Sequence, residues 1–304
     1  MPSIDAYYFS IIMYSGVNII LAVSLNLVNG INGQFSMGHA GFMAVGAYIS
    51  AVISMLLLPH FPESGSAVRG VILVISLFAG ALVSASVGVL VGLPSLRLRG
   101  DYLAIVTLGF GEIIRVILLN TQYVGGARGL PGIPPLSTFG WVYSFAILTI
   151  FVIWQVGNSA RGRAMLSVRE DEIAAEAMGV NTTQAKVHAF TIGAFFAGIA
   201  GGLFAHTLQY LNPATFDFNR SFEAIIMVVL GGMGSITGSV VAAVFLTVFR
   251  EALRPLQEIT HTDFRMVFYA IVLIILMLSR PNGLFGTREL TDILGRFRKP
   301  RSAE

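Results

Sequence analysis

Eight apolar stretches of roughly membrane-spanning length follow one another along this chain, and they constrain its fold more than any other feature of the sequence. A helix needs about 20 apolar residues to cross the hydrocarbon core of a bilayer. In lipid every backbone polar group must be paired, which helices achieve within a single segment. We therefore predict an all-α, polytopic membrane protein with about eight or nine spans, forming one transmembrane domain over residues 1 to 304. The stretches lie near residues 9 to 28, 36 to 58, 70 to 92, 102 to 119, 141 to 157, 187 to 208, 222 to 250 and 264 to 279.

The composition agrees with a membrane protein and excludes several classes of site. Only 12% of the residues are charged, whereas about a quarter are charged in soluble proteins. The sequence has no cysteine, and its five histidines lack metal-ligand spacing, so neither disulfides nor a metal site are expected. The basic residues sit at the ends of spans rather than in one patch, which predicts a lipid bilayer as partner and no nucleic acid. The first ten residues carry no Lys or Arg, so the first apolar segment is expected to stay in the mature protein.

The distribution of positive charge predicts the orientation. Residues 93 to 101, 158 to 186 and 280 to 304 hold most of the 19 Lys and Arg residues. By the positive-inside rule these stretches are cytoplasmic, including a basic C-terminal tail over 287 to 304. The N-terminus is then outside if the first two segments each cross the membrane, and three loops face outward. These loops are 59 to 69, 120 to 140 and 209 to 221.

Two stretches of the chain are rich in glycine where a continuous helix would be expected. Asn29 to Gly41 combines glycines with amides, and Leu230 to Gly238 holds four glycines in nine residues. Each glycine costs a helix about 1 kcal/mol, so both stretches predict broken or re-entrant helices. Counting crossings between Lys186 and Arg280, both predicted to be cytoplasmic, requires the stretch 222 to 250 to enter the membrane and return.

Interrupted helices in opposite halves of a membrane protein point to a solute pathway, because irregular backbone survives there only inside protein or beside water. Close packing of helices through small residues is the alternative explanation for the glycines. The candidate pathway residues are Asn29, Asn32, Gln34, Ser36, His39, Glu112, Gly231, Gly232, Gly234 and Ser235.

Ionisable residues within the apolar segments are few. Glu112 is either a pathway residue or the partner of Arg115, three residues later on the same helix face. His39 and His206 have no charged neighbour in sequence, so we expect hydrogen-bonded structural roles for them. Glu223 either caps the half-helix that it opens or lines an outer vestibule.

One polar segment, residues 158 to 186, interrupts the apolar chain and is predicted to be a cytoplasmic loop that docks a soluble partner. Ser167 and Glu170 match a capping box, which predicts a short helix over 168 to 178 that ends at Gly179. Asn181 and Gln184 repeat the capping pattern at the start of the next apolar helix. On the outer side, residues 125 to 135 are rich in glycine and proline, which predicts an ordered loop, or else a plain connection.

Motifs for covalent or nucleotide chemistry are missing from the sequence. It has no G-x-x-x-x-G-K-[ST] phosphate loop, no G-x-S-x-G and no H-E-x-x-H. The chain is therefore not expected to hydrolyse ATP, and uphill transport would draw energy from an ion gradient or from a partner. A gradient-driven carrier usually needs several buried acids, so the near isolation of Glu112 favours a partner.

Five ordered motifs together resemble the larger permease subunit of branched-chain amino acid ABC transporters, the LivM type. The resemblance spans nearly the whole chain. The motifs are Ser24 to Ala51, Leu98 to Arg115, Gly125 to Ile133, Gly162 to Asn181 and Val228 to Ala243.

This resemblance implies an importer of the bacterial inner membrane that works by alternating access. Its expected partners are two cytosolic ABC ATPase subunits, a sister permease of the LivH type and a periplasmic solute-binding protein. No cofactor is expected in this chain, because ATP and Mg²⁺ would be held by the ATPase subunits.

The resemblance also implies which residues of the polar segment couple to an ATPase subunit. The segment is similar to the EAA loop of bacterial importers, although Ile173 stands where that motif has its glutamate. The implied coupling residues are Ser167, Glu170, Glu172, Ala174, Ala175, Glu176 and Gly179.

The expected substrates are leucine, isoleucine and valine, but the same motifs occur in permeases for urea, short amides and aromatic acids. A stand-alone channel or gradient-driven carrier is the alternative from a different class, in which case the polar segment would be a regulatory loop.

Overall fold

The computed structural model describes residues 6–61, 65–95, 98, 100–252, 271, 274, 278–279 and 283–286, and helices dominate these residues. In this part of the chain six helices are long and apolar enough to cross a membrane. They match the first six predicted segments, whereas most of the eighth lies outside the described residues. The six helices are α1 (Ala6–Asn26, continued by the π-helical turn η1, Leu27–Ile31), α2 (His39–Leu57), α3 (Ser66–Ser95), α4 (Asp101–Asn120), α5 (Phe139–Asn158) and α8 (Thr182–Leu208).

The seventh predicted segment forms two helices, α9 (Phe218–Gly231) and α10 (Ile236–Ala252). At 1.5 Å per residue they are about 21 and 26 Å long, shorter than the hydrocarbon core of a bilayer. The backbones of Gly231 and Gly238 touch at one end of the pair, and Glu223 reaches Arg250 at the other end, 3.4 Å away. The helices therefore fold back on each other, which confirms the predicted break and return.

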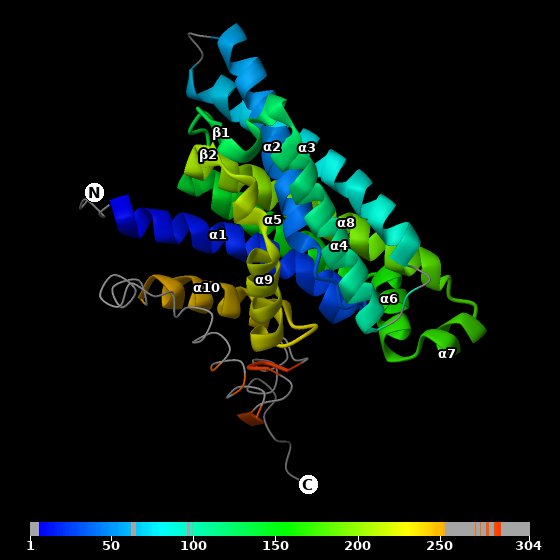
Figure 1. The fold of residues 1–304 in the computed structure, drawn as a ribbon. Coiled ribbons are helices and arrows are strands. Elements are labelled where there is room, and N and C mark those ends of the chain that lie inside the picture. The colour runs from blue at the N-terminus through cyan, green and yellow to red at the C-terminus, as the bar shows by residue number, and fades with distance from the viewer. Residues whose placement is uncertain are drawn as a thin grey trace, which may run out of the picture.

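The central core is formed by α2, α3 and α8, which run side by side in Figure 1. Three glycines, one from each helix, bring the backbones together: Gly46, Gly80 and Gly198. A Cβ atom at Gly46 would overlap the backbone of Gly198, and one at Gly80 would lie 2.7 Å from the carbonyl oxygen of Gly46. We call this contact the glycine seam, and it shows the close packing through small residues that membrane helices favour.

The helices α4 and α5 lie at the periphery of the bundle. Their outward side chains are large and apolar, with Ile105 and Ile147 about two-thirds exposed. Apolar side chains facing outward suit contact with lipid tails, which are as apolar as the protein core.

The two ends of the bundle are built differently. At one end the loop predicted to face outward forms two short turns, η3 (Gln122–Val124) and η4 (Gly126–Arg128), and then β1 (Leu130–Pro131), which pairs antiparallel with β2 (Tyr210–Leu211). The Tyr210 hydroxyl donates to the carbonyl of Arg128 at 2.8 Å, so this loop is ordered, as predicted. At the other end Figure 1 shows α6 (Ala160–Glu170) and α7 (Glu172–Ala177). Two further turns are η2 (Leu58–His60) and η5 (Pro213–Phe216).

Candidate functional site at two helix breaks

The first helix break runs from Leu27 to Gly38, between α1 and α2. It begins with the π turn, in which Asn32 N–H donates to Leu27 O at 3.0 Å, and continues without regular structure. Gly33 has a φ of +71°, which favours glycine. The Asn29 side chain stabilises the irregular part, since its Oδ1 accepts from Ser36 N–H (3.1 Å) and its Nδ2 donates to Ser36 O (3.3 Å). The predicted interruption of the helix is therefore confirmed.

The second break, Gly232 to Ser235, separates α9 from α10. Gly232 and Gly234 have φ angles of +113° and +94°, where a side chain would be strained. Asn26 of α1 holds this turn in place, because its Oδ1 accepts from Gly234 N–H (2.8 Å) and its Nδ2 donates to Ser235 O (3.0 Å).

A short stretch near the C-terminus completes the second break. The N–H groups of Leu284 and Phe285 donate to the carbonyls of Leu230 and Gly231, at 2.9 and 3.2 Å. These are the last carbonyls of α9, which have no donor within their own helix. The end of α9 is thus closed by residues more than 50 positions later in the chain.

The two breaks touch each other. A Cβ atom at Gly30 would overlap both Gly234 N and the Asn26 side chain, so only glycine fits at position 30. We call this contact, formed by Asn26, Gly30, Gly234 and Ser235, the break junction. Near residue 231 the glycines have two structural roles, because Gly231 packs closely against Gly238 while Gly232 and Gly234 shape the turn.

Several buried polar atoms of the first break lack a hydrogen-bond partner among the described residues. They are both side-chain polar atoms of Asn32, Oε1 of Gln34 and Oγ of Ser36, and these side chains are 6% exposed or less. Leaving a buried polar group unpaired costs about 1–3 kcal/mol. Such groups in a membrane protein are suited to meeting water or a polar solute.

The structure brings most of the predicted pathway residues to this region but leaves Glu112 apart. Glu112 lies on peripheral α4, is 38% exposed and pairs with Arg115 at 2.7 Å, which favours the alternative of a self-contained ion pair. His39 lies at the start of α2, where its Nε2 is 2.8 Å from Ser24 Oγ. His206 Nδ1 lies 2.9 Å from Pro134 O. Both histidines are hydrogen-bonded, as predicted.

The polar segment departs from its predicted form. It contains two helices rather than one helix over 168 to 178. Ser159 caps α6 by accepting from Gly162 N–H, and Asp171 caps α7 by accepting from Ile173 N–H (2.9 Å). The prediction of a capping box at Ser167 and Glu170 is wrong, because Ser167 lies inside α6 and its hydroxyl donates to Ala164 O (2.8 Å). The physical reason is that Asp171, with an extended backbone, interrupts the helix and caps the next one.

The end of the polar segment follows the prediction. Gly179 has a φ of +83° and ends α7, with Val180 N–H donating to Ala175 O at 3.0 Å. Asn181 Oδ1 accepts from Gln184 N–H at 2.9 Å and caps α8.

The predicted coupling residues fall into exposed and anchoring groups. Glu170, Ala174, Glu176 and Gly179 are exposed, as is Ile173. Ala175 is buried and Ser167 is partly buried. Glu172 joins α7 to α8 through Lys186, whose Nζ lies 2.6 Å from Glu172 Oε1 and whose side chain is only 4% exposed.

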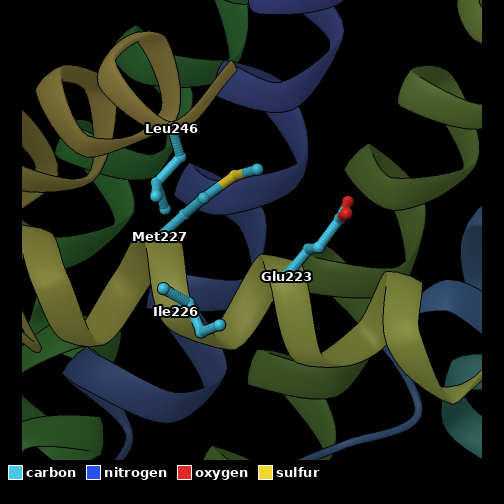
Figure 2. A pocket seen from close by; sticks show the side chains of 4 residues that line it. All are labelled: Glu223, Ile226, Met227 and Leu246. Carbon is cyan, nitrogen blue, oxygen red and sulfur yellow. The ribbon is translucent and has the colours of Figure 1, made fainter. Parts of the chain in front are cut away.

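The small pocket in Figure 2 is lined by residues from both arms of the hairpin. Leu246 reaches it from α10, and Glu223, Ile226 and Met227 line it from α9. Glu223 does not cap α9, since Asp217 accepts from Arg220 N–H. Instead its carboxylate pairs with Arg220 (3.1 Å) and Arg250 (3.4 Å), which fastens the arms of the hairpin.

Three residues of this region were not predicted from the sequence to be site residues: Asn26, Gly30 and Arg169. Arg169 lies at the end of α6 and donates from Nη1 to Gly30 O at 2.8 Å. The spacing of Asn26, Asn29 and Asn32, three residues apart, is a signal that could have marked Asn26. In the described part of the chain, no cluster of His, Asp or Glu could hold a metal ion.

Comparison with known proteins gives a consistent result. A sequence family described as "Branched-chain amino acid transport system / permease component" matches residues 7–277. The permease protein LivM of the high-affinity branched-chain amino acid transport system is similar in Salmonella typhimurium (38% identity) and Escherichia coli (37%). In each case 88% of this chain and 67% of the relative are covered. Escherichia coli LivH is 26% identical over 94% of this chain and 98% of its own length. No solved structure matches.

Proposed function

The chain belongs to the permease components of branched-chain amino acid transport systems, and from this premise we propose that it forms half of the transmembrane route of an ABC importer for leucine, isoleucine and valine. The observation that carries the proposal is the break junction, where two interrupted helices meet beside unpartnered polar groups. The neighbouring polar segment supplies a surface for a soluble partner.

The proposed pathway follows the first break. Asn32, Gln34 and Ser36 offer buried polar atoms without partners in the described structure. A zwitterionic amino acid, or the water around it, can supply the missing hydrogen bonds. Irregular backbone at membrane depth is found beside such solute routes. Gly231, Gly232, Gly234 and Ser235 let the facing hairpin change its angle, and Asn29 and His39 hold the ends of the irregular stretch. Glu112 has the weakest support as a pathway residue because it is paired on a peripheral helix.

The proposed coupling surface is the exposed face of α6 and α7 within residues 158 to 186. Ile173 and Met178 are 67% and 84% exposed there. Large apolar side chains on a polar segment mark interaction sites when they cluster with polar neighbours. Two cytosolic ABC ATPase subunits are the proposed partners, one on this chain and one on a LivH-type sister permease. ATP and Mg²⁺ belong to the ATPase subunits, and ATP-driven closure of their dimer moves α6 and α7.

The remaining partners follow from the proposed topology of a single domain over 1 to 304. In the bacterial inner membrane the N-terminus is periplasmic, and the segment 158 to 186 and the tail 287 to 304 are cytoplasmic. A periplasmic solute-binding protein delivers the amino acid to the side of the outer loop.

The identity of the substrate is the most specific statement in the proposal. It is supported by the names of the LivM and LivH relatives, while urea, short amides and aromatic acids remain alternatives. A stand-alone carrier is the rival from another class, and the scarcity of acids in the described spans argues against it.

The proposal is tested by reconstituting the chain with the neighbouring gene products in liposomes. We expect leucine-loaded binding protein to stimulate ATP hydrolysis and radiolabelled leucine to accumulate inside. Assembly and ATPase activity without a leucine response would move the substrate to an alternative. Transport by the purified chain alone would overturn the ABC assignment.

Glu176 tests the coupling surface, because it is exposed on α7. We expect Glu176→Lys to stop loaded binding protein from stimulating ATP hydrolysis, with little change in thermal stability. Glu176→Gln, which keeps the shape of the side chain, is the matched control and should keep more of the stimulation. Full coupling in Glu176→Lys would remove α7 from the docking surface. Glu172→Lys is a poorer test, since it breaks the pair with buried Lys186.

A further inference from the structure

The side chain of Arg169 lies against both helix breaks, although it belongs to α6 of the polar segment. Its Nη1 donates to Gly30 O at 2.8 Å. A Cβ atom at Gly33 would lie 2.7 Å from Arg169 Cγ, and one at Gly234 would lie 2.9 Å from Arg169 Nη1. One arginine thus contacts the first break at two points and the second break at a third.

The charge of Arg169 suits this position. The π turn that ends at Ile31 extends α1, so the guanidinium bonds a carbonyl in the last turn of that helix and lies near Gly234, three residues after the end of α9. The last carbonyls of a helix lack internal donors and carry partial negative charge. A cation there is stabilised by this partial charge. Glu170 is 3.8 Å from Arg169 Nε and 77% exposed, so it competes weakly for the cation.

The contacts on either side of Arg169 allow it to transmit movement. Asp171, directly after α6, has an extended backbone and separates α6 from α7. Beyond it Glu172 is tied to α8 through the buried Lys186. The end of α6 is therefore held to the breaks by Arg169, while α7 is held to α8 by a separate ion pair.

We propose that Arg169 is a latch that holds the two breaks closed against each other and is withdrawn when α6 and α7 move. This inference rests on the proposed function for its role in transport. In the latched state Gly30 and Gly234 are in contact, and the unpartnered side chain of Asn32 is 1% exposed. Withdrawal of the guanidinium releases Gly30 O, lets the breaks separate and opens the first break to solvent.

The first test measures opening directly and needs neither substrate nor ATP hydrolysis. The sequence has no cysteine, so Asn32→Cys is the single reporter within this chain for a maleimide reagent added to membranes that hold the whole complex, with labelling read on the separated chain. We expect Arg169→Met to raise the labelling rate about tenfold, in the range of ordinary coupling between sites. Arg169→Lys, which keeps the positive charge but loses the planar guanidinium group, should give an intermediate labelling rate.

Arg163→Met is the matched control for this test. Arg163 lies on the same helix and donates to a backbone carbonyl, Asn158 O at 3.2 Å, at the far end of α6 from the breaks. We expect its labelling rate to equal that of the parent. Equal rates in Arg169→Met and Arg163→Met would overturn the latch, whatever the complex transports.

The second test uses the reconstituted complex and separates a latch from a merely structural contact. We expect Arg169→Met to lower the number of leucine molecules imported per ATP hydrolysed about tenfold, with partial rescue by Arg169→Lys. A normal ratio in Arg169→Met would overturn the proposal. Loss of complex assembly in Arg169→Met, with a normal ratio in Arg169→Lys and unchanged labelling, would make Arg169 structural. Absence of leucine uptake by the parent complex would instead refute the proposed substrate and leave the labelling test standing.

Discussion

The glycine seam and the break junction both bring backbones into contact through glycine, yet they differ in what surrounds the glycines. In the seam, Gly46, Gly80 and Gly198 lie within continuous helices. At the break junction, Gly30 and Gly234 lie where helices stop, and Gly234 has a positive φ. Asparagine side chains there replace the hydrogen bonds that a continuous helix would make.

This difference shows that glycine serves two purposes in one membrane domain. In the seam it reduces the distance between rigid helices, which stabilises the bundle. At the break junction it permits an irregular backbone, whose polar groups must be satisfied one by one. Substitutions in the seam should therefore damage folding, and substitutions at the break junction should damage transport at a smaller cost in stability.

The largest loss of stability is expected for Gly46→Val in the seam. The added side chain would meet the backbone of Gly198, which cannot move aside, and overpacking of this kind costs about 3 kcal/mol or more. The measurement is the melting temperature and yield of the folded protein in detergent. Gly109→Val on α4 is the control, because a Cβ atom at Gly109 meets nothing within 4 Å. A stable Gly46→Val protein would remove the distinction between the two regions.

A smaller loss of stability is expected for Asn26→Ala at the break junction. The change removes two hydrogen bonds to the 234–235 turn, at about 2 kcal/mol. Gly234 N–H loses this acceptor, whereas Ser235 O still accepts from Ser239. Thermal unfolding of Asn26→Ala and of Asn120→Ala, whose amide bonds only its own helix at Val116 O, gives the comparison. Equal melting temperatures would mean that the turn does not depend on Asn26.

Gly234→Ala should cost about 1 kcal/mol, the usual penalty for a side chain at positive φ. Gly132→Ala, in the loop between α4 and α5, should have the same cost, because Gly132 has a φ of +80° and an added Cβ atom would meet nothing within 4 Å. The Cβ of Gly234→Ala would also lie 2.9 Å from Arg169 Nη1, so we expect this variant to melt slightly lower than Gly132→Ala and it alone to lose leucine uptake. Similar uptake in both would mean that the second break is a passive turn.

The smallest effect on stability is expected for Asn32→Ala, because the lost amide has no partner in the described structure. The melting temperature should stay the same or rise, while uptake of leucine falls. Asn158→Ala, at the exposed end of α5, controls for loss of an amide. Unchanged uptake in Asn32→Ala would remove this residue from the pathway and favour a site filled only by water.

The sequence was sufficient to predict most of the fold, since long apolar segments leave few alternatives to a helix. Segments six and seven were predicted well, because Asn181 and Gln184 form a true cap and the glycines after Leu230 break the helix. The same reasoning failed at Ser167, where two capping residues compete. A serine can also lie within a helix, and only the extended backbone at Asp171 shows which residue begins α7.

The site was harder to predict because its contacts join distant parts of the chain. Asn29 bonds to Ser36, seven residues away, and the irregular stretch between them was predicted. Asn26 and Arg169 act across more than 130 positions, on Ser235 and Gly30 respectively. Local patterns carry no information on such pairs, so the sequence alone marked Arg169 only as one positive charge among several.

The hydrogen bonds from Leu284 and Phe285 to the end of α9 have a consequence for how the protein is made. The second break cannot be completed while the ribosome is still synthesising the chain upstream of these residues. Until then the last carbonyls of α9 lack these two donors. The order of translation thus places closure of this turn after synthesis of the helices that precede Leu284 in the chain.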